Sequence, residues 1–153
     1  MKLNEKLQAM GLSLPDPPKA LAAYVPAVRT GNLIVISGQL PMLEGNLTVA
    51  GKVPSQVSLD DARLAARQCV LNMLAVLGPV IDQDWTRIRR VVRLGVFVAS
   101  DPAFTEQHLV ANGASEFLVK LFGDIGRHAR AAVGVPSLPL NAPVEVEGLF
   151  EVG

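Results

Sequence analysis

Apolar residues recur at the 3.6-residue period of a helix in two parts of the chain. The first part covers residues 62–77, where Ser58 can cap the N-terminus and Gly78-Pro79 should stop the helix. The second helix is expected to begin at Asp101-Pro102, a cap followed by a proline at the first helical position, and to end at Gly123.

Short apolar runs bounded by turn residues predict the strands. Residues 25–28 and 33–36 flank the turn Thr30-Gly31-Asn32 and predict a hairpin, with a weak strand near Thr48. Longer strands are expected at three further places: residues 87–99, 131–135 and 143–152. The order β-β-(β)-α-β-α-β-β predicts an α+β fold, in which two helices cover one face of a mixed sheet.

The last strand indicates what lies on each face of that sheet. One side is apolar and the other carries three acidic residues: Val144, Val146, Gly148, Phe150 and Val152 against Glu145, Glu147, Leu149 and Glu151. Because two helices can cover only one face, the second face is expected to meet another subunit.

The long strand is expected to separate apolar from basic side chains. Apart from Arg90, one face carries the apolar positions Ile88, Val92, Leu94, Val96 and Val98. Arg87, Arg89 and Arg93 share the other face, where a basic row could bind phosphate and hence RNA. The strand lacks flanking aromatic residues for base stacking, so a solvated or interface face is the alternative.

Composition narrows the class of protein. The 153 residues suit one domain, expected over 1–153, with 50% hydrophobic residues and a mean hydropathy of +0.34 that argue against disorder. Lys and Arg together number 14, as do Asp and Glu, so the net charge is zero. A neutral chain has no global field to steer it to nucleic acid or anionic lipid, and neither is expected as a partner.

The small numbers of cysteines and histidines argue against a disulfide-stabilised or metal-binding protein. Cys69 is the one cysteine, so no internal disulfide can form, and in mid-helix it is expected to be an inert, partly buried thiol. His108 and His128 have no ligand spacing, so no metal site is expected. The sequence shows no signal peptide and no apolar run of about 20 residues, and a soluble, cytoplasmic protein with no membrane partner is expected.

Two kinds of charged side chain could carry chemistry. Arg130 opens an otherwise apolar strand, and its guanidinium fork could hold a carboxylate by two parallel hydrogen bonds. Glu145 and Glu147 point to the same side of a strand, and one of them could act as a general acid or base towards water. Both sets could instead lie in solvent or form structural ion pairs.

Residues 130–147, RAAVGVPSLPLNAPVEVE, resemble a family signature in which an arginine precedes Val, Leu-Pro and a Val-Glu-Val-Glu strand. Further stretches agree: the hairpin over 24–41, Asn72 on the first long helix, Val96-Phe97-Val98 followed by Asp101, and Asn112 and Glu116 on the second long helix. On these residues the chain resembles the RidA (YjgF) family of reactive-intermediate deaminases.

This resemblance implies a chorismate-mutase-like (YjgF-like) α+β fold. It also implies a homotrimer whose sheets form a central barrel, with three ligand clefts between subunits. Residues 1–19 would be an N-terminal extension that the core of the family lacks, with one short helix ending at Gly11.

The resemblance further implies hydrolysis of enamines and imines, such as 2-aminoacrylate, to 2-keto acids and ammonia without a cofactor. Arg130 matches the arginine that clamps the substrate carboxylate, and Glu145 matches the acidic residue that positions or activates water. Tyr24 matches a tyrosine that closes the cleft from a neighbouring chain, and Gly38 matches a backbone contact to the substrate. Asn112 is expected to contribute to substrate binding.

The segment after the arginine departs from the family pattern. Ala131 and Ala132 stand where family deaminases often carry Ser and Cys, and Gly134 replaces a common acidic residue. Ala132 is therefore expected to line a less polar and roomier substrate cleft. These departures favour, as an alternative, a non-catalytic trimer that binds small carboxylates as a regulator, and endoribonuclease activity is a further alternative.

Overall fold

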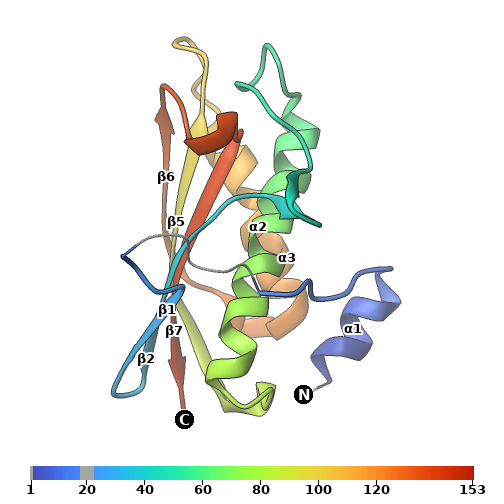
Figure 1. Ribbon diagram of the computed structural model, residues 1–153, viewed down its shortest axis with the longest axis vertical. Coiled ribbons are helices and arrows are strands. Elements are labelled where there is room, and N and C mark those ends of the chain that lie inside the picture. The colour runs from blue at the N-terminus through green and yellow to red at the C-terminus, as the bar shows by residue number, and fades with distance from the viewer. Residues whose placement is uncertain (1, 18–22) are drawn as a thin grey trace.

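The computed structural model describes residues 2–17 and 23–153, and its helices and strands follow the expected order (Figure 1). The helices are α1 (Leu3–Ala9), α2 (Leu59–Val80) and α3 (Gln107–Phe122), with short 3-10 turns η1 (Trp85–Arg87), η2 (Gly123–Gly126) and η3 (Pro139–Asn141). The strands are β1 (Ala27–Thr30), β2 (Leu33–Gln39), β3 (Met42–Leu43), β4 (Asn46–Leu47), β5 (Ile88–Ala99), β6 (Ala129–Val135) and β7 (Val144–Val152).

Five strands form one mixed sheet in the order β1-β2-β7-β5-β6. The pairs β1–β2, β2–β7 and β7–β5 are antiparallel, whereas β5 and the edge strand β6 run parallel. Helices α2 and α3 lie together on one face of this sheet (Figure 1). The α+β fold with a mixed sheet and two helices on one face is therefore confirmed.

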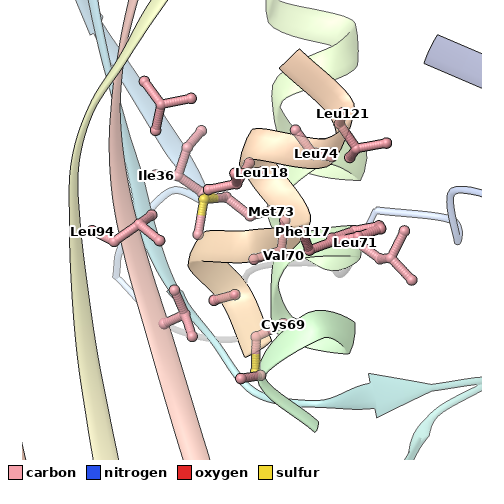
Figure 2. Close-up of a cluster of buried hydrophobic side chains, with 14 of the residues drawn as sticks. Ile36, Cys69, Val70, Leu71, Met73, Leu74, Leu94, Phe117, Leu118 and Leu121 are labelled. Atoms are coloured by element: carbon pink, nitrogen blue, oxygen red, sulfur yellow. The ribbon is translucent and has the colours of Figure 1, made fainter. Parts of the chain in front are cut away.

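The hydrophobic core fills the space between these helices and the sheet. Met73 of α2 and Leu118 of α3 lie with Ile36 and Leu94 of the sheet in this layer (Figure 2), and each is less than 2% exposed. Gly148 on β7 allows the close approach, because a Cβ there would stand 2.6 Å from the Met73 sulfur.

Helix α1 packs beside α3 rather than extending into solvent. Leu3 and Leu7 are fully buried, and Lys6 Nζ donates a hydrogen bond of 2.7 Å to the carbonyl of Leu121 near the end of α3. That bond places a cation where the helix dipole of α3 is negative.

The structure confirms the cap of α2 but not the start of α3. Ser58 Oγ accepts from the backbone N–H of Asp61, at 3.1 Å. Helix α3 begins at Gln107, so the expectation that Asp101-Pro102 opens it was wrong. The Asp101 carboxylate instead accepts from the backbone N–H of Ser55, a residue 46 positions away, which a local capping pattern cannot reveal.

Strand β5 differs from the simple alternation expected of it. Its pairing with β7 shifts register between Ile88 and Arg90 and again between Val91 and Arg93. An extra residue at a bulge changes which side chains share a face, so Val91, rather than Val92, is fully buried under the helices.

The same bulges break up the expected row of arginines. Arg87 lies in η1, before the strand, and donates to Asp82 at 3.1 Å. The two register shifts interrupt the period between Arg89 and Arg93, and Arg93 is paired with Glu147 at 3.3 Å. An uninterrupted basic face for RNA is therefore not formed on β5.

The face of the sheet opposite the helices, called here the open face, is apolar at several exposed positions. Four apolar side chains belong to this face: Val28, Leu33, Val35 and Val133, which are 52%, 37%, 47% and 45% exposed.

No helix in the described parts of the chain is both long and apolar enough to cross a membrane.

Candidate functional site

Arg130 projects from the edge strand β6 towards α3. It is paired with Leu94 of β5, whose side chain is buried under the helices, so both residues face the helical side of the sheet. Its Nη1 donates to Asn112 Oδ1 at 2.9 Å and to Ser115 Oγ at 3.1 Å. Its Nη2 donates to the backbone carbonyl of His108, at 3.5 Å.

All three of these acceptors are neutral, so they orient the guanidinium without cancelling its charge. None of the ion pairs found among residues 2–17 and 23–153 involves Arg130. A guanidinium has five N–H groups. The three bonds use three of them and leave Nε–H and one N–H of Nη2, enough to hold a carboxylate by two hydrogen bonds.

His128 lies next to Ser115, and the two side chains form a hydrogen-bonded pair. Ser115 Oγ is 2.8 Å from His128 Nε2, and His128 Nδ1 is 2.7 Å from the carbonyl of Gly126. A carbonyl can only accept, so Nδ1 carries the hydrogen of the neutral ring and Nε2 accepts from the Ser115 hydroxyl. Burial, together with the charge of Arg130, lowers the pKa of His128, which favours this neutral form.

The sequence alone assigns no role to His128 and does not single out Ser115. One signal could have pointed to His128, since it stands two positions before Arg130 and residues at i and i+2 of an extended chain share a side. Ser115 could not be found in this way, because its place depends on the packing of α3 against β6.

A surface depression of about 240 Å³ opens at this pair. Its lining residues come from α3, from β6 and from the segment that leads into β6: Ser115, Val119, Arg127, His128 and Arg130. The site is therefore reachable from solvent beside the guanidinium.

The remaining positions on the same side of β6 are Ala132 and Gly134. Ala132 is half-buried against the core. The side chain of Gln107 lies beside Gly134, and its Nε2 would stand 2.7 Å from a Cβ at that position. Gln107 is held there by donating to the carbonyl of Phe104 at 2.8 Å. Gly134, Gln107 and Pro136 line a depression of about 450 Å³. The roomier substrate cleft expected around Ala132 stays a prediction.

Glu145 and Gly38 lie together on the open face. Glu145 is paired with Phe97 across β5 and β7, and its carboxylate packs over Gly38 so closely that a Cβ there would overlap it. Partial burial, and then the neighbouring charge of Glu147, raise the pKa of Glu145 above its ordinary value. This carboxyl is therefore a better proton acceptor than an ordinary solvated glutamate.

The segment after Tyr24 lies next to this second group. Ser37 Oγ donates to the carbonyl of Val25 at 2.8 Å, which holds the segment after Tyr24 against β2. The Tyr24 side chain is 56% exposed. The second group is thus Gly38 and Glu145, with the backbone after Tyr24 beside it.

The structure divides the predicted site residues between the two sides of the sheet. Arg130, Asn112 and Ala132 lie on the helical side of the edge strand, whereas Glu145 and Gly38 lie on the open face. Arg130 and Glu145 of the same protomer therefore cannot act on one small molecule, and only residues of two different protomers could meet around it.

Cys69 and Asn72, two further residues noted in the sequence, are both buried. Cys69 is fully buried, and burial raises the pKa of its thiol well above the usual value, as expected for an inert cysteine. Among the described residues, no group of three or more His, Cys, Asp or Glu side chains could hold a metal ion. Asn72 is buried and donates to the carbonyls of Leu40 and Met42, both at 2.9 Å, so it holds the β3 segment against α2.

Comparison with known proteins identifies the family. Residues 4–151 match the family model described as "YjgF/chorismate_mutase-like, putative endoribonuclease". The match begins inside the segment 1–19 and confirms the chorismate-mutase-like fold.

Similar proteins cover nearly all of the chain. Protein TCP17 of Trypanosoma cruzi is 41% identical over 99% of this chain and 94% of its own. A 2-iminobutanoate/2-iminopropanoate deaminase of Dermatophagoides farinae is 29% identical over 92% of this chain and 94% of its own. The crystal structure of protein Atu1372 from Agrobacterium tumefaciens, of unknown function, is 45% identical with a TM-score of 0.91, covering 98% of this chain and 91% of that one. The chain therefore belongs to the YjgF family, also known as the RidA family.

Proposed function

We propose that this protein hydrolyses 2-imino acids and their enamine tautomers to 2-keto acids and ammonia, without a cofactor. The observation that carries this proposal is the state of Arg130, a cation fixed by three neutral acceptors with two N–H groups left for a ligand. A relative named as a deaminase of two such imino acids supports the choice of substrate.

The proposed site forms between protomers of a homotrimer. The apolar open face would be buried in that assembly, as exposed apolar patches of this kind usually are. One protomer would supply Arg130, Asn112 and Ala132, and its neighbour would supply Tyr24, Gly38 and Glu145. This arrangement accounts for the separation of the two groups within a single chain.

The chemistry then needs orientation more than covalent help. Arg130 holds the substrate carboxylate, and this leaves the adjacent imine carbon, already electrophilic, open to water. Glu145 takes a proton from the attacking water as the new C–O bond forms. This proton passes to the nitrogen, which gives a carbinolamine. The hydroxyl proton then also passes to the nitrogen, the C–N bond breaks as the C=O bond forms, and ammonia and the 2-keto acid leave.

The test is release of 2-ketobutyrate from an imine generated enzymatically in the same vessel. Substitution Arg130→Ala removes two charge-assisted hydrogen bonds, each contributing about 1.5–3 kcal/mol, so kcat/KM should fall at least tenfold. The matched control is Arg89→Ala, an exposed arginine on β5, which should keep wild-type activity.

Two outcomes would contradict the proposal. If the wild type releases 2-ketobutyrate no faster than Arg130→Ala or buffer, the protein is not an imine deaminase. If 2-ketobutyrate raises the Tm of the wild type, but not of Arg130→Ala, without any turnover, the protein is a carboxylate-binding regulator. Ala132 favours that second function, because it supplies no polar group beside Arg130.

A further inference from the structure

We infer that His128 is a positioning residue for Arg130, which acts through Ser115 and sets which N–H groups of the guanidinium face a ligand. The consequence for substrate binding rests on the proposed function, in which Arg130 holds the substrate carboxylate. The orientation of Arg130 itself rests on hydrogen bonds within the chain and can be measured separately.

The hydrogen bonds between Gly126 and Arg130 have a single direction when the imidazole is neutral. The Gly126 carbonyl accepts from His128 Nδ1, so Nε2 is left as an acceptor. Ser115 Oγ lies 2.8 Å from Nε2 and gives its single hydrogen to the ring. Its lone pairs then remain for Arg130 Nη1, which can only donate, at 3.1 Å.

Without His128, the Ser115 hydroxyl would have a different partner. Ser115 lies in the middle of α3, and a serine inside a helix commonly donates to the carbonyl four positions back, here that of Ala111. That bond turns the hydroxyl towards its own helix backbone. His128 instead draws the hydroxyl across to the β6 side, where the oxygen meets Arg130.

His128 is itself fixed relative to α3. Gly126 of η2 is buried, and a Cβ on it would stand 2.6 Å from the carbonyl oxygen of Leu118, so η2 and the α3 backbone are in direct contact. The Gly126 carbonyl then holds His128 Nδ1 at 2.7 Å. The histidine and the serine that it orients are therefore both anchored to the same helix.

This arrangement occupies Arg130 Nη1 completely. One of its N–H groups donates to Asn112 Oδ1 and the other to Ser115 Oγ. A carboxylate can therefore meet only Nε–H and the remaining N–H of Nη2, on the side of the guanidinium away from Ser115. If Ser115 turns away, Nη1 regains a free N–H and the guanidinium loses one of the bonds that restrain its rotation.

Two variants of His128 separate its two hydrogen bonds. The amide of His128→Asn ends near the position of Nδ1, so it can still donate to Gly126 but cannot reach Ser115. The longer amide of His128→Gln ends near the position of Nε2, so its oxygen can accept from Ser115. We expect His128→Asn to lose the orientation of Arg130 and His128→Gln to restore it.

Nitrogen-detected NMR of Arg130 tests this orientation without any ligand. Rotation about the Nε–Cζ bond exchanges Nη1 with Nη2, so the bonds that hold Nη1 slow this exchange. His128→Asn and Ser115→Ala should each speed the exchange by about three- to tenfold, the effect of one hydrogen bond. The exchange in His128→Gln should stay close to that of the wild type.

The proposed function adds a kinetic measurement. Arg130 holds the carboxylate both in the bound substrate and during the reaction, so His128→Asn should raise KM for the imine by about three- to tenfold and leave kcat nearly unchanged. Calorimetry should show the same rise in Kd for 2-ketobutyrate. A purely structural defect would instead lower the fraction of active protein, and hence the apparent kcat, at an unchanged KM.

A double variant shows whether His128 acts through Ser115. If it does, His128→Asn combined with Ser115→Ala should be no worse than Ser115→Ala alone, because the partner of His128 is already lost. The matched control is Ser13→Ala, an exposed serine after α1, which should behave as wild type in every measurement.

The results separate this inference from the proposed function. Unchanged exchange of the Arg130 nitrogens in His128→Asn, or single effects that multiply in the double variant, would overturn the positioning role alone. A wild type that neither binds 2-ketobutyrate nor releases it from imines would overturn the proposed function, and the NMR comparison would still decide the positioning role.

Discussion

The arginines of this chain differ in the groups that accept their hydrogen bonds, and Arg130 differs in this respect from the arginines found in ion pairs. Arg63, Arg87 and Arg93 each meet a carboxylate, so their charges are already balanced. Arg130 meets an amide oxygen, a hydroxyl and a backbone carbonyl. A cation held by neutral acceptors retains its attraction for an external anion, which is the property a carboxylate clamp needs.

The ionisation of Glu145 should respond to the charge of its neighbour Glu147. Burial is the larger cause of its raised pKa, and the charge of Glu147 is the second. Substitution Glu147→Gln removes that charge and should lower the pKa of Glu145. Carbon-detected NMR titration of the Glu145 carboxyl measures the change directly, and the acid limb of the deaminase pH profile should move to lower pH in parallel.

The control for this prediction is Glu151→Gln, on the same face of β7 but farther along the strand. It should leave the Glu145 titration unchanged. An unchanged pKa in Glu147→Gln would mean that Arg93, which is paired with Glu147 at 3.3 Å, already cancels the effect of its charge.

At the scale of elements, regular periods were predictable from the sequence and interruptions were not. Strand β7 alternates without a break between buried and half-buried positions, and α2 is capped by Ser58 as predicted. The predicted start of α3 was wrong because a contact distant in sequence fixes Asp101. The predicted buried face of β5 was wrong because its bulges are set by pairing with β7. Local patterns contain neither kind of information.

The contact between α2 and α3 depends on a residue with no side chain. A Cβ at Gly113 of α3 would overlap the backbone carbonyl of Arg63 in α2, and backbone cannot move aside as a side chain can. Gly113→Ala should therefore lower the free energy of unfolding by about 1–3 kcal/mol, despite the better helix propensity of alanine. Thermal unfolding measured by circular dichroism should show a Tm lower by several degrees.

Gly78→Ala in α2 is the matched control. The atoms nearest to its new Cβ belong to the end of the Gln83 side chain, at 2.7 Å and beyond, which can rotate away. Its Tm should stay close to that of the wild type. Equal Tm values for wild type and Gly113→Ala would show that the two helices can separate at little cost.

At the scale of the whole molecule, the motif in the sequence identified most of the candidate site but not its division between two sides of the sheet. Arg130 and Asn112 are 18 positions apart and meet at 2.9 Å, whereas Glu145, only 15 positions from Arg130, faces the other way. The parity of each strand register decides this, and register is fixed by pairing rather than by distance along the chain. The two groups can serve one ligand only if chains associate through the open face.

Substitution Val35→Glu should prevent that association. Val35 is 47% exposed on the open face of the protomer, opposite Leu149 of β7, and a charge there would be costly to bury between subunits. Native mass spectrometry should show trimers for the wild type and mainly monomers for Val35→Glu, with far-UV circular dichroism unchanged. Deaminase activity should be lost with the trimer.

Leu64→Glu provides the matched control, because Leu64 is 52% exposed but lies on α2, away from the open face. It should remain trimeric and active. A wild type that is monomeric at micromolar concentration, or a Val35→Glu protein that stays trimeric, would show that the open face is not the interface. Arg130 and Glu145 would then have no route to a common substrate, and the water-activating role of Glu145 would have to be abandoned.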